Sequence, residues 1–170
     1  MKYTEIEIGQ KAEIIHELTA RDISKFVELT GDDNRLHVDE DFAKSTSYKK
    51  QVAHGMLGAS FISTVIGTKL PGDGALWFSQ NLEFLLPVRI GDTITVIAEV
   101  IKKYDRDEII ELSTNILNQN KQLVTKGIAK VKLVNQEDDE VFNDSEDKNT
   151  AAKKVGLVLG ASGGIGIEVI

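Results

Sequence analysis

The sequence predicts an α+β fold in which a long antiparallel sheet wraps around one apolar helix. Residues 55–70 (GMLGASFISTVIGTKL) contain a single charge, Lys69, and are apolar on nearly every face, as expected of a helix buried in a core. Four later segments alternate apolar and polar residues, and turn residues separate them. Because such strands have one apolar face, we expect the sheet to cover the helix with that face.

The remaining elements follow in chain order. Residues 11–17 alternate as a first strand, and residues 20–30 are predicted to form a short helix that begins after Thr19 and ends at Gly31. Residues 39–44 begin with three acids and indicate another short helix. The later strands are indicated by alternation at Leu82, Phe84 and Leu86, Ile94 to Val100, Ile110 to Ile116, and Leu123 to Leu133. A sheet wrapped in this way around a central helix is the hot-dog fold.

Composition divides the chain into three regions. Residues 1–134 carry the periodic pattern and form the predicted hot-dog domain, whereas residues 135–153 are polar and acidic and are typical of a flexible linker. Within that linker, residues 137–148 hold seven acids and one lysine, which accounts for most of the net charge of −7. Residues 154–170 (KVGLVLGASGGIGIEVI) turn apolar and glycine-rich.

Charge and cysteine content exclude several classes of protein. The chain has no cysteine, which rules out a disulfide scaffold, and it lacks the clustered Lys and Arg of a nucleic-acid surface. The first 19 residues lack the apolar centre of a signal peptide, and no segment approaches the roughly 20 apolar residues of a membrane span. We therefore expect a cytoplasmic protein that binds neither nucleic acid nor membrane.

The candidate chemistry lies in TGDDNRLH, residues 30–37, and in QVAHGM, residues 51–56. Asp32 and His37 on one loop could act on a water molecule as general acid and base. The same residue types are also ordinary turn and cap residues after a helix. An EF-hand is excluded because its required glycine would fall at His37, and a metal site built from Asp32, His37 and His54 has no recognised spacing.

These two motifs, together with LEFLLPVRIGDTI at residues 82–94, resemble the MaoC-like dehydratases, which include the (R)-specific enoyl-CoA hydratases of the hot-dog fold. The resemblance covers residues 10–134. Members usually carry proline after the asparagine of the first motif, where this chain has Arg35. The substitution changes the stiffness of the turn but removes no functional group.

The resemblance implies a role for each matching residue. Asp32 and His37 match the catalytic pair that holds the reacting water, and Asn34 matches a residue that supports the pair through hydrogen bonds. Gly55 matches the glycine whose backbone N–H binds the thioester carbonyl oxygen, a role suited to a helix N-terminus. Substrate-binding positions are expected at Ser63, His54 and Met56, although a structural role is favoured for His54.

The implied reaction is the reversible hydration of trans-2-enoyl thioesters of coenzyme A or acyl carrier protein, with no metal or other cofactor. Asp32 would take a proton from water while His37 delivers one to C2, although the spacing does not decide which residue is the base. A hot-dog thioesterase is the first alternative, but residues 55–70 lack the acidic residue expected there. A non-catalytic acyl-binding subunit is the second. Because sheet edges tend to pair, we expect a homodimer or larger oligomer.

The last segment resembles another family. An apolar run followed by Gly160, Gly164 and Gly166 is similar to the first strand and dinucleotide-binding turn of the short-chain dehydrogenase/reductases. A βαβ unit needs about 30 residues, so this segment is not expected to bind a cofactor alone. We interpret it as the truncated start of a reductase domain in a longer dehydratase–reductase fusion.

Overall fold

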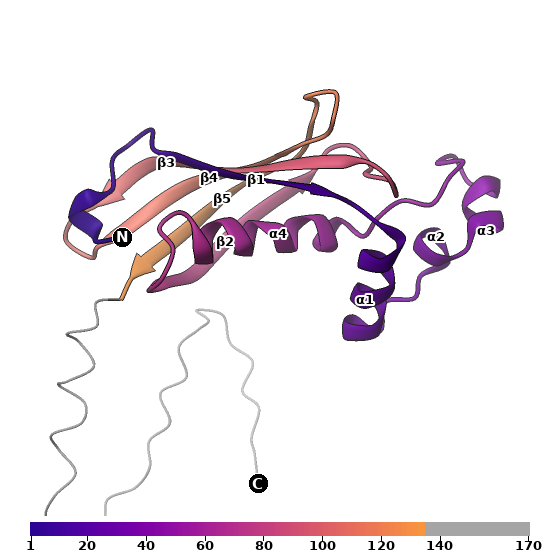
Figure 1. Cartoon of the computed structure of the whole chain (residues 1–170), viewed down its shortest axis with the longest axis horizontal. Coiled ribbons are helices and arrows are strands. Elements are labelled where there is room, and N and C mark those ends of the chain that lie inside the picture. The colour runs from indigo at the N-terminus through magenta and orange to yellow at the C-terminus, as the bar shows by residue number, and fades with distance from the viewer. Residues whose placement is uncertain (135–170) are drawn as a thin grey trace, which may run out of the picture.

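The computed structural model describes residues 1–134, which form one curved antiparallel sheet with its helices on one side (Figure 1). The strand order is β1-β3-β4-β5-β2. The strands are β1 (Lys11–Glu17), β2 (Ala75–Phe84), β3 (Thr93–Tyr104), β4 (Ile109–Leu117) and β5 (Leu123–Leu133). The predictions for 135–153 and 154–170, including the three glycines of the dinucleotide-type turn, lie outside the described residues.

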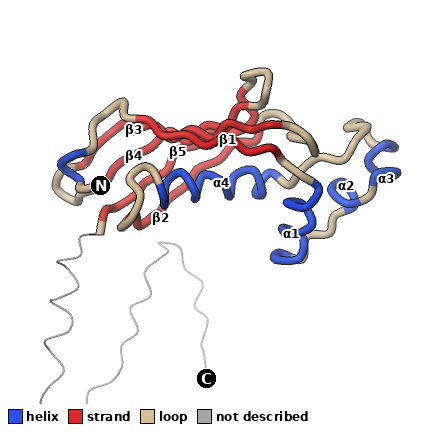
Figure 2. The backbone as a smooth tube through the Cα atoms, in the orientation of Figure 1, coloured by secondary structure: helices blue, strands red, loops and turns tan. Residues whose placement is uncertain are grey.

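The helices form two groups (Figure 2). Helix α4 (Gly55–Thr68) runs along the concave face of the sheet, whereas α1 (Ala20–Thr30), α2 (Arg35–Val38) and α3 (Glu40–Ser45) lie beyond its N-terminal end. A short 3-10 helix, η1 (Tyr3–Glu5), precedes β1. No helix within residues 1–134 is long and apolar enough to cross a membrane. The α+β hot-dog prediction is confirmed.

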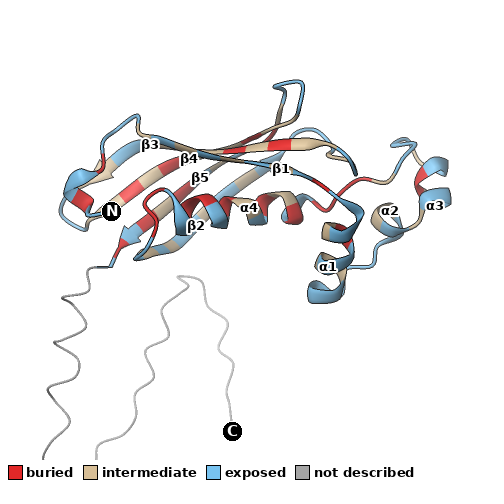
Figure 3. Cartoon of the chain, in the orientation of Figure 1, coloured by how far each residue is buried: buried red, intermediate tan, exposed pale blue. Residues whose placement is uncertain are grey.

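The core lies between α4 and the sheet (Figure 3). Ile62 and Val65 of α4 pack with Val96 and Val100 of β3 in one cluster of buried side chains. Alternate residues of β3 and β4 are buried, so each strand turns one face toward the helix. This packing fixes the position of the α4 N-terminus relative to the sheet, and the candidate site is built around that N-terminus.

The other face of α4 is exposed, contrary to the prediction of a helix buried nearly all round. Ser60, Ser63, Thr64 and Gly67 are exposed in this chain, as is Met56 in the first turn. The sheet covers one side of the helix only, so its small and hydroxyl residues face away from the core. The helix also ends at Thr68, two residues earlier than the pattern indicated.

Strand β2 differs most from its prediction. It begins at Ala75, and its register shifts between Trp77 and Ser79, a bulge that leaves Phe78 52% exposed. Trp77 packs against the core, whereas Phe78 does not. After the bulge, Phe84 ends the strand half exposed. The expected alternation through Leu86 fails because β2 ends at Phe84, so Leu86 lies beyond the strand.

Candidate active site

The segment that follows α1 brings the candidate acid–base residues to one place. Helix α1 ends at Gly31 in the left-handed conformation, with φ of 76°. Asn34 then caps α2, because its side-chain oxygen accepts a hydrogen bond from the Leu36 N–H at 3.0 Å. The backbone N–H of Asn34 donates to Oδ1 of Asp32 at 3.3 Å. The segment predicted as a loop therefore contains a one-turn helix, which carries His37.

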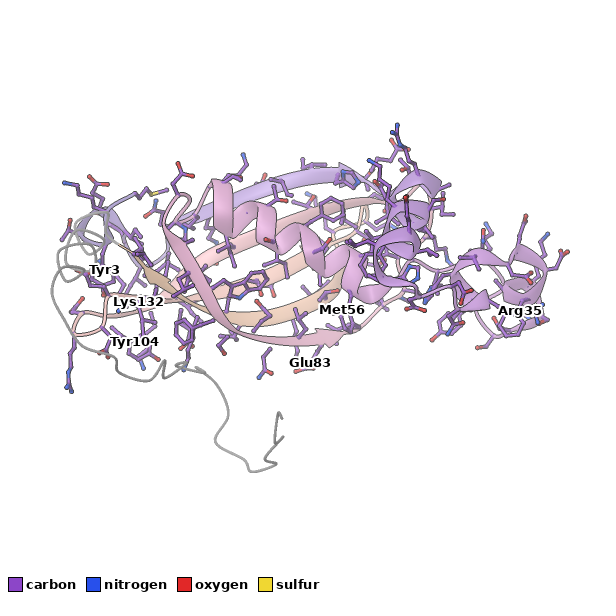
Figure 4. All side chains as sticks on the ribbon, turned by 90° about the horizontal axis from the view of Figure 1, so that it is seen from below. Tyr3, Arg35, Met56, Glu83, Tyr104 and Lys132 are labelled. Carbon is purple, nitrogen blue, oxygen red and sulfur yellow. The ribbon has the colours of Figure 1, made fainter. Side chains whose placement is uncertain are left out.

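Arg35 and Asp39 attach α2 to α3. The Arg35 guanidinium donates to the Asp39 carboxylate through Nε at 3.0 Å and Nη2 at 2.8 Å, and it lies 4.6 Å from the centre of the Phe42 ring. Hydrogen bonds from the Phe42 backbone and from Arg35 lower the pKa of Asp39. Figure 4 shows Arg35 among these short helices, away from Met56 on α4. These contacts constrain the turn at the position where the family usually has proline.

The orientation of His37 is set by a backbone carbonyl. Its Nδ1 lies 2.7 Å from the carbonyl oxygen of Val52. Because a carbonyl only accepts hydrogen bonds, Nδ1 carries the proton and donates it. The Nε2 atom is then the nitrogen that can gain or lose a proton. The Gln51 side chain also donates to the His37 carbonyl at 3.1 Å and ties α2 to the segment before α4.

His54 is the buried centre of the site, with 3% of its surface exposed. Its Nε2 donates to the backbone carbonyl of Asp32 at 2.9 Å. Its ring lies 3.8 Å from the ring of His37 and 4.9 Å from that of Phe26, measured between centroids. Within residues 1–134 its Nδ1 has no hydrogen-bond partner. His54 thus contacts both members of the candidate pair.

Three side chains meet at this point. Asp32, His37 and His54 each bring one potential ligand atom within 4.8 Å of the others. The Asp32 side chain is 52% exposed, so a small molecule can reach it. One water molecule can hydrogen-bond to two acceptors at this separation. A cation could also bind there, because each histidine donates one ring nitrogen to a backbone carbonyl and keeps the other nitrogen as a potential ligand.

The first turn of α4 adds hydrogen-bond donors. His54 is the N-cap residue, but its side chain makes no capping hydrogen bond. The backbone N–H groups of Gly55 and Met56 have no acceptor among residues 1–134. A helix N-terminus also carries partial positive charge. These free donors can therefore stabilise negative charge on an oxygen placed at the end of the helix axis.

A cavity of about 410 Å³ adjoins these groups. His37, His54, Gly55 and Met56 line its polar end, and apolar side chains line most of the rest, including Leu18, Phe84, Leu86, Val88, Ile94, Ile116 and Val124. Ser63 does not line this cavity and is exposed on α4. Asp32 does not line the cavity either, but it lies against His37 and His54, which do. The cavity thus joins one member of the acid–base pair to a helix N-terminus and an apolar chamber.

Several lining residues lay outside the sequence-based prediction of the site. Tyr48, Phe84, Leu85 and Leu86 line the cavity. Nothing in the local pattern distinguished them, because Tyr48 lies in a turn, Phe84 ends β2, and Leu85 and Leu86 follow it. The motif LEFLLP contains three of them, but it served only to predict a strand and to support the family resemblance.

Comparison with known proteins decides the family. The model of the MaoC like domain matches residues 3–122. The chain belongs to the MaoC-like dehydratase family. It is 47% identical over 98 residues to an (R)-specific enoyl-CoA hydratase of Rhodospirillum rubrum, covering 58% of this chain and 68% of the relative. A second relative, the (R)-specific enoyl-CoA hydratase of Aeromonas caviae, is 38% identical over 133 residues, covering 78% of this chain and 99% of the relative.

Solved structures of MaoC-like hydratases have the same fold. The (R)-hydratase from A. caviae superposes with a TM-score of 0.75 at 38% identity, covering 76% of this chain and 98% of that one. The R-hydratase PhaJ1 from Pseudomonas aeruginosa gives a TM-score of 0.73 at 32% identity, covering 91% of this chain and 96% of that one.

Proposed function

We propose that this MaoC-like protein catalyses the reversible hydration of trans-2-enoyl thioesters to (R)-3-hydroxyacyl thioesters. The observation that carries the proposal is the meeting of Asp32 with His37 and His54, with His37 and the first turn of α4 together on the wall of an apolar cavity. Hydration of an enoyl thioester needs these parts: groups that hold and deprotonate water, donors for the enolate oxygen, and a chamber for the acyl chain.

In the proposed mechanism the thioester carbonyl oxygen accepts hydrogen bonds from the α4 N-terminus at Gly55. The Asp32 carboxylate removes a proton from the bound water, and the water oxygen forms a bond to C3. Negative charge moves to the carbonyl oxygen as the C2–C3 double bond becomes a single bond. His37, which begins the step protonated on both ring nitrogens, then delivers the Nε2 proton to C2. The proton that Asp32 took from water passes to Nε2 afterwards, so the net change is the addition of one water molecule. Dehydration follows the same steps in reverse.

The backbone contacts of the pair suit this division of roles. Nδ1 of His37 donates to the Val52 carbonyl whether the ring is neutral or protonated, so only Nε2 changes its protonation. The Asn34 N–H contacts Oδ1 of Asp32 and holds the carboxylate toward the same point. Hydration involves no net oxidation or reduction, so these side chains can catalyse it without a redox cofactor.

Relatives support the substrate class. Curated relatives include a 3-hydroxybutyryl-CoA dehydratase of Methylorubrum extorquens, 43% identical over 98 residues, which cover 58% of this chain and 62% of that protein. They also include a mitochondrial 3-hydroxyacyl-[acyl-carrier-protein] dehydratase of Arabidopsis thaliana, 30% identical over 123 residues. The carrier of the acyl group in this protein is therefore proposed to be coenzyme A or acyl carrier protein, and the test below includes both.

A homodimer is the assembly that we propose. The exposed face of α4 carries small and hydroxyl residues (Ser60, Ser63, Thr64 and Gly67), which allow another backbone to approach closely. The end strands β1 and β2 each leave one edge unpaired within residues 1–134. A second copy against the exposed α4 face would also bury Ser63, which is exposed in the single chain. The family resemblance implies that Ser63 binds substrate, a role that needs a more enclosed position.

The experiment is a direct assay of enoyl-thioester absorbance with crotonyl-CoA and with crotonyl-acyl carrier protein. We expect the wild-type protein to remove the enoyl band, and Asp32→Asn and His37→Gln each to slow the loss by on the order of 100-fold. Asp33→Asn is the matched control, because Asp33 is the neighbouring exposed acid and does not belong to the group formed by Asp32, His37 and His54. We expect it to retain wild-type activity.

The alternatives predict different results. Release of free thiol without hydration would support a thioesterase. Binding of both thioesters without either reaction would support the acyl-binding subunit. Equal activity of Asp32→Asn and wild type would contradict the proposed mechanism while leaving the reaction in place.

A further inference from the structure

The side chain of Phe84 occupies the space beside Gly55. A Cβ atom placed on Gly55 would lie 2.9 Å from Cδ1 and Cε1 of the Phe84 ring and 3.2 Å from Cζ. Cβ atoms are not found that close to other atoms, so any side chain at position 55 must push the ring aside. By contrast, Cβ atoms placed on Gly58 and Gly67 of the same helix meet nothing within 4 Å.

The Phe84 ring lies beside the first residue of α4. The Cα–Cβ bond of a helical residue points outward and leans toward the helix N-terminus, the same end from which the first N–H groups point. Phe84 therefore borders the free N–H groups of Gly55 and Met56 on one side. Its backbone is held by pairing with Thr125, and the next residue, Leu85, donates to the Val124 carbonyl at 2.8 Å.

From this geometry we propose that Phe84 is a positioning residue for the thioester carbonyl, and that position 55 is glycine to admit the Phe84 ring. The proposal rests on the proposed function. The ring forms an apolar wall that keeps water from one side of the α4 donors. Hydrogen bonds from N–H groups to a developing oxyanion are stronger where water is excluded, so the wall acts on the transition state.

A double-mutant cycle tests this pairing. Phe84→Ala should lower kcat about tenfold with a smaller change in KM, a loss below that of removing an oxyanion donor outright. Gly55→Ala should lower kcat by a similar factor, because the new methyl group displaces the ring. In the Phe84→Ala background, the same Gly55→Ala change should alter kcat less than about twofold, since no ring remains to be displaced.

The control is Phe78→Ala. Phe78 lies on the same strand, is 52% exposed against 50% for Phe84, and lines no part of the cavity. We expect this variant to keep the wild-type kcat and KM. A loss of kcat equal to that of Phe84→Ala would show that loss of any aromatic residue from β2 is harmful, which would overturn the proposal.

Two further results would overturn it. If Gly55→Ala costs the same factor with and without Phe84, the methyl group collides with substrate and the ring is irrelevant. If Phe84→Ala raises KM alone, the ring only binds substrate.

Should the wild type hydrate no enoyl thioester, the proposed function fails separately. In that case the melting temperatures of the wild type, the two single variants and the double variant test the contact between the two residues. The contact requires that the shift in the double variant differ from the sum of the single shifts by about 4 °C or more.

Discussion

His54 joins the two candidate catalytic side chains through contacts of different kinds. It donates a hydrogen bond to the backbone of Asp32, and its ring packs against the ring of His37 at an angle of 33°. The hydrogen bond fixes where the Asp32 segment lies, and the ring contact limits the movement of the imidazole. These contacts suit a positioning role for His54, and the structural role favoured for it from the sequence stays a prediction.

Replacement of His54 by phenylalanine separates these contacts. His54→Phe keeps an aromatic ring against His37 and Phe26 but removes the donor to Asp32. We expect kcat to fall by about tenfold or more, because small displacements of reacting groups are costly, while KM changes less. Steady-state kinetics with crotonyl-CoA measure both constants. A kcat equal to that of wild type would show that the ring contact alone holds the pair.

At this scale the sequence placed Asp32, Asn34 and His37 in one segment, because all three lie within six residues. It could not place the contacts that orient them. The carbonyl that binds His37 belongs to Val52, and the carbonyl that binds His54 belongs to Asp32, 22 residues away. Contacts of this range depend on how α2 and α4 pack, which no local pattern contains.

Among the elements, α1 has a complete N-terminal cap. Thr19 Oγ1 accepts from the Asp22 N–H at 3.2 Å, and the Asp22 carboxylate accepts from the Thr19 N–H at 2.8 Å. His16 on β1 reaches the same carboxylate at 3.0 Å. The capping pattern in the sequence predicted this helix correctly. The start of β2 was missed because the bulge between Trp77 and Ser79 interrupts the period of two, and its end was placed two residues too late, at Leu86.

The stability that Asp22 provides should depend on pH. Burial alone would raise the pKa of Asp22, but hydrogen bonds from Thr19 and His16 outweigh it and lower the pKa below its usual value. The contribution is therefore present above the unfolded pKa of about 3.9 and is lost as the pH falls through the lower folded value. We expect Asp22→Asn to lower the melting temperature at pH 6.

The same comparison near pH 3 should give a smaller difference in melting temperature, because the wild-type carboxylate is then becoming protonated. Differential scanning calorimetry at both pH values measures it. Asp73→Asn, a change at an exposed acid in a turn, serves as the control. A difference between wild type and Asp22→Asn that stays constant with pH would show that the cap does not depend on the charge.

For the whole molecule, the one-sided sheet leaves α4 with an exposed face. The apolar pattern of the sequence predicted that α4 lies against the sheet, and it does. The pattern did not show which residues face away, because serine, threonine and glycine suit a core, a solvent face or an interface equally well. A second copy against this face would explain why the helix is apolar almost all round.

Molar mass tests this assembly. The chain has a mass of 18.7 kDa, so light scattering should give about twice that value if the homodimer forms. Thr64→Glu places a charge on the exposed face of α4, and we expect it to shift the protein toward the single-chain mass. Ser24→Glu, on exposed α1, should not. A single-chain mass for the wild type would contradict the homodimer.

The reacting groups and the walls of the cavity belong to different parts of the chain. Asp32 and His37 are held by main-chain contacts between residues 30 and 55, whereas the deep lining includes Ile94, Ile116 and Val124 from the sheet. Substitutions at these sheet positions would therefore change the room for an acyl chain without moving the acid–base pair. A library confined to them would vary substrate scope while leaving the chemistry constant.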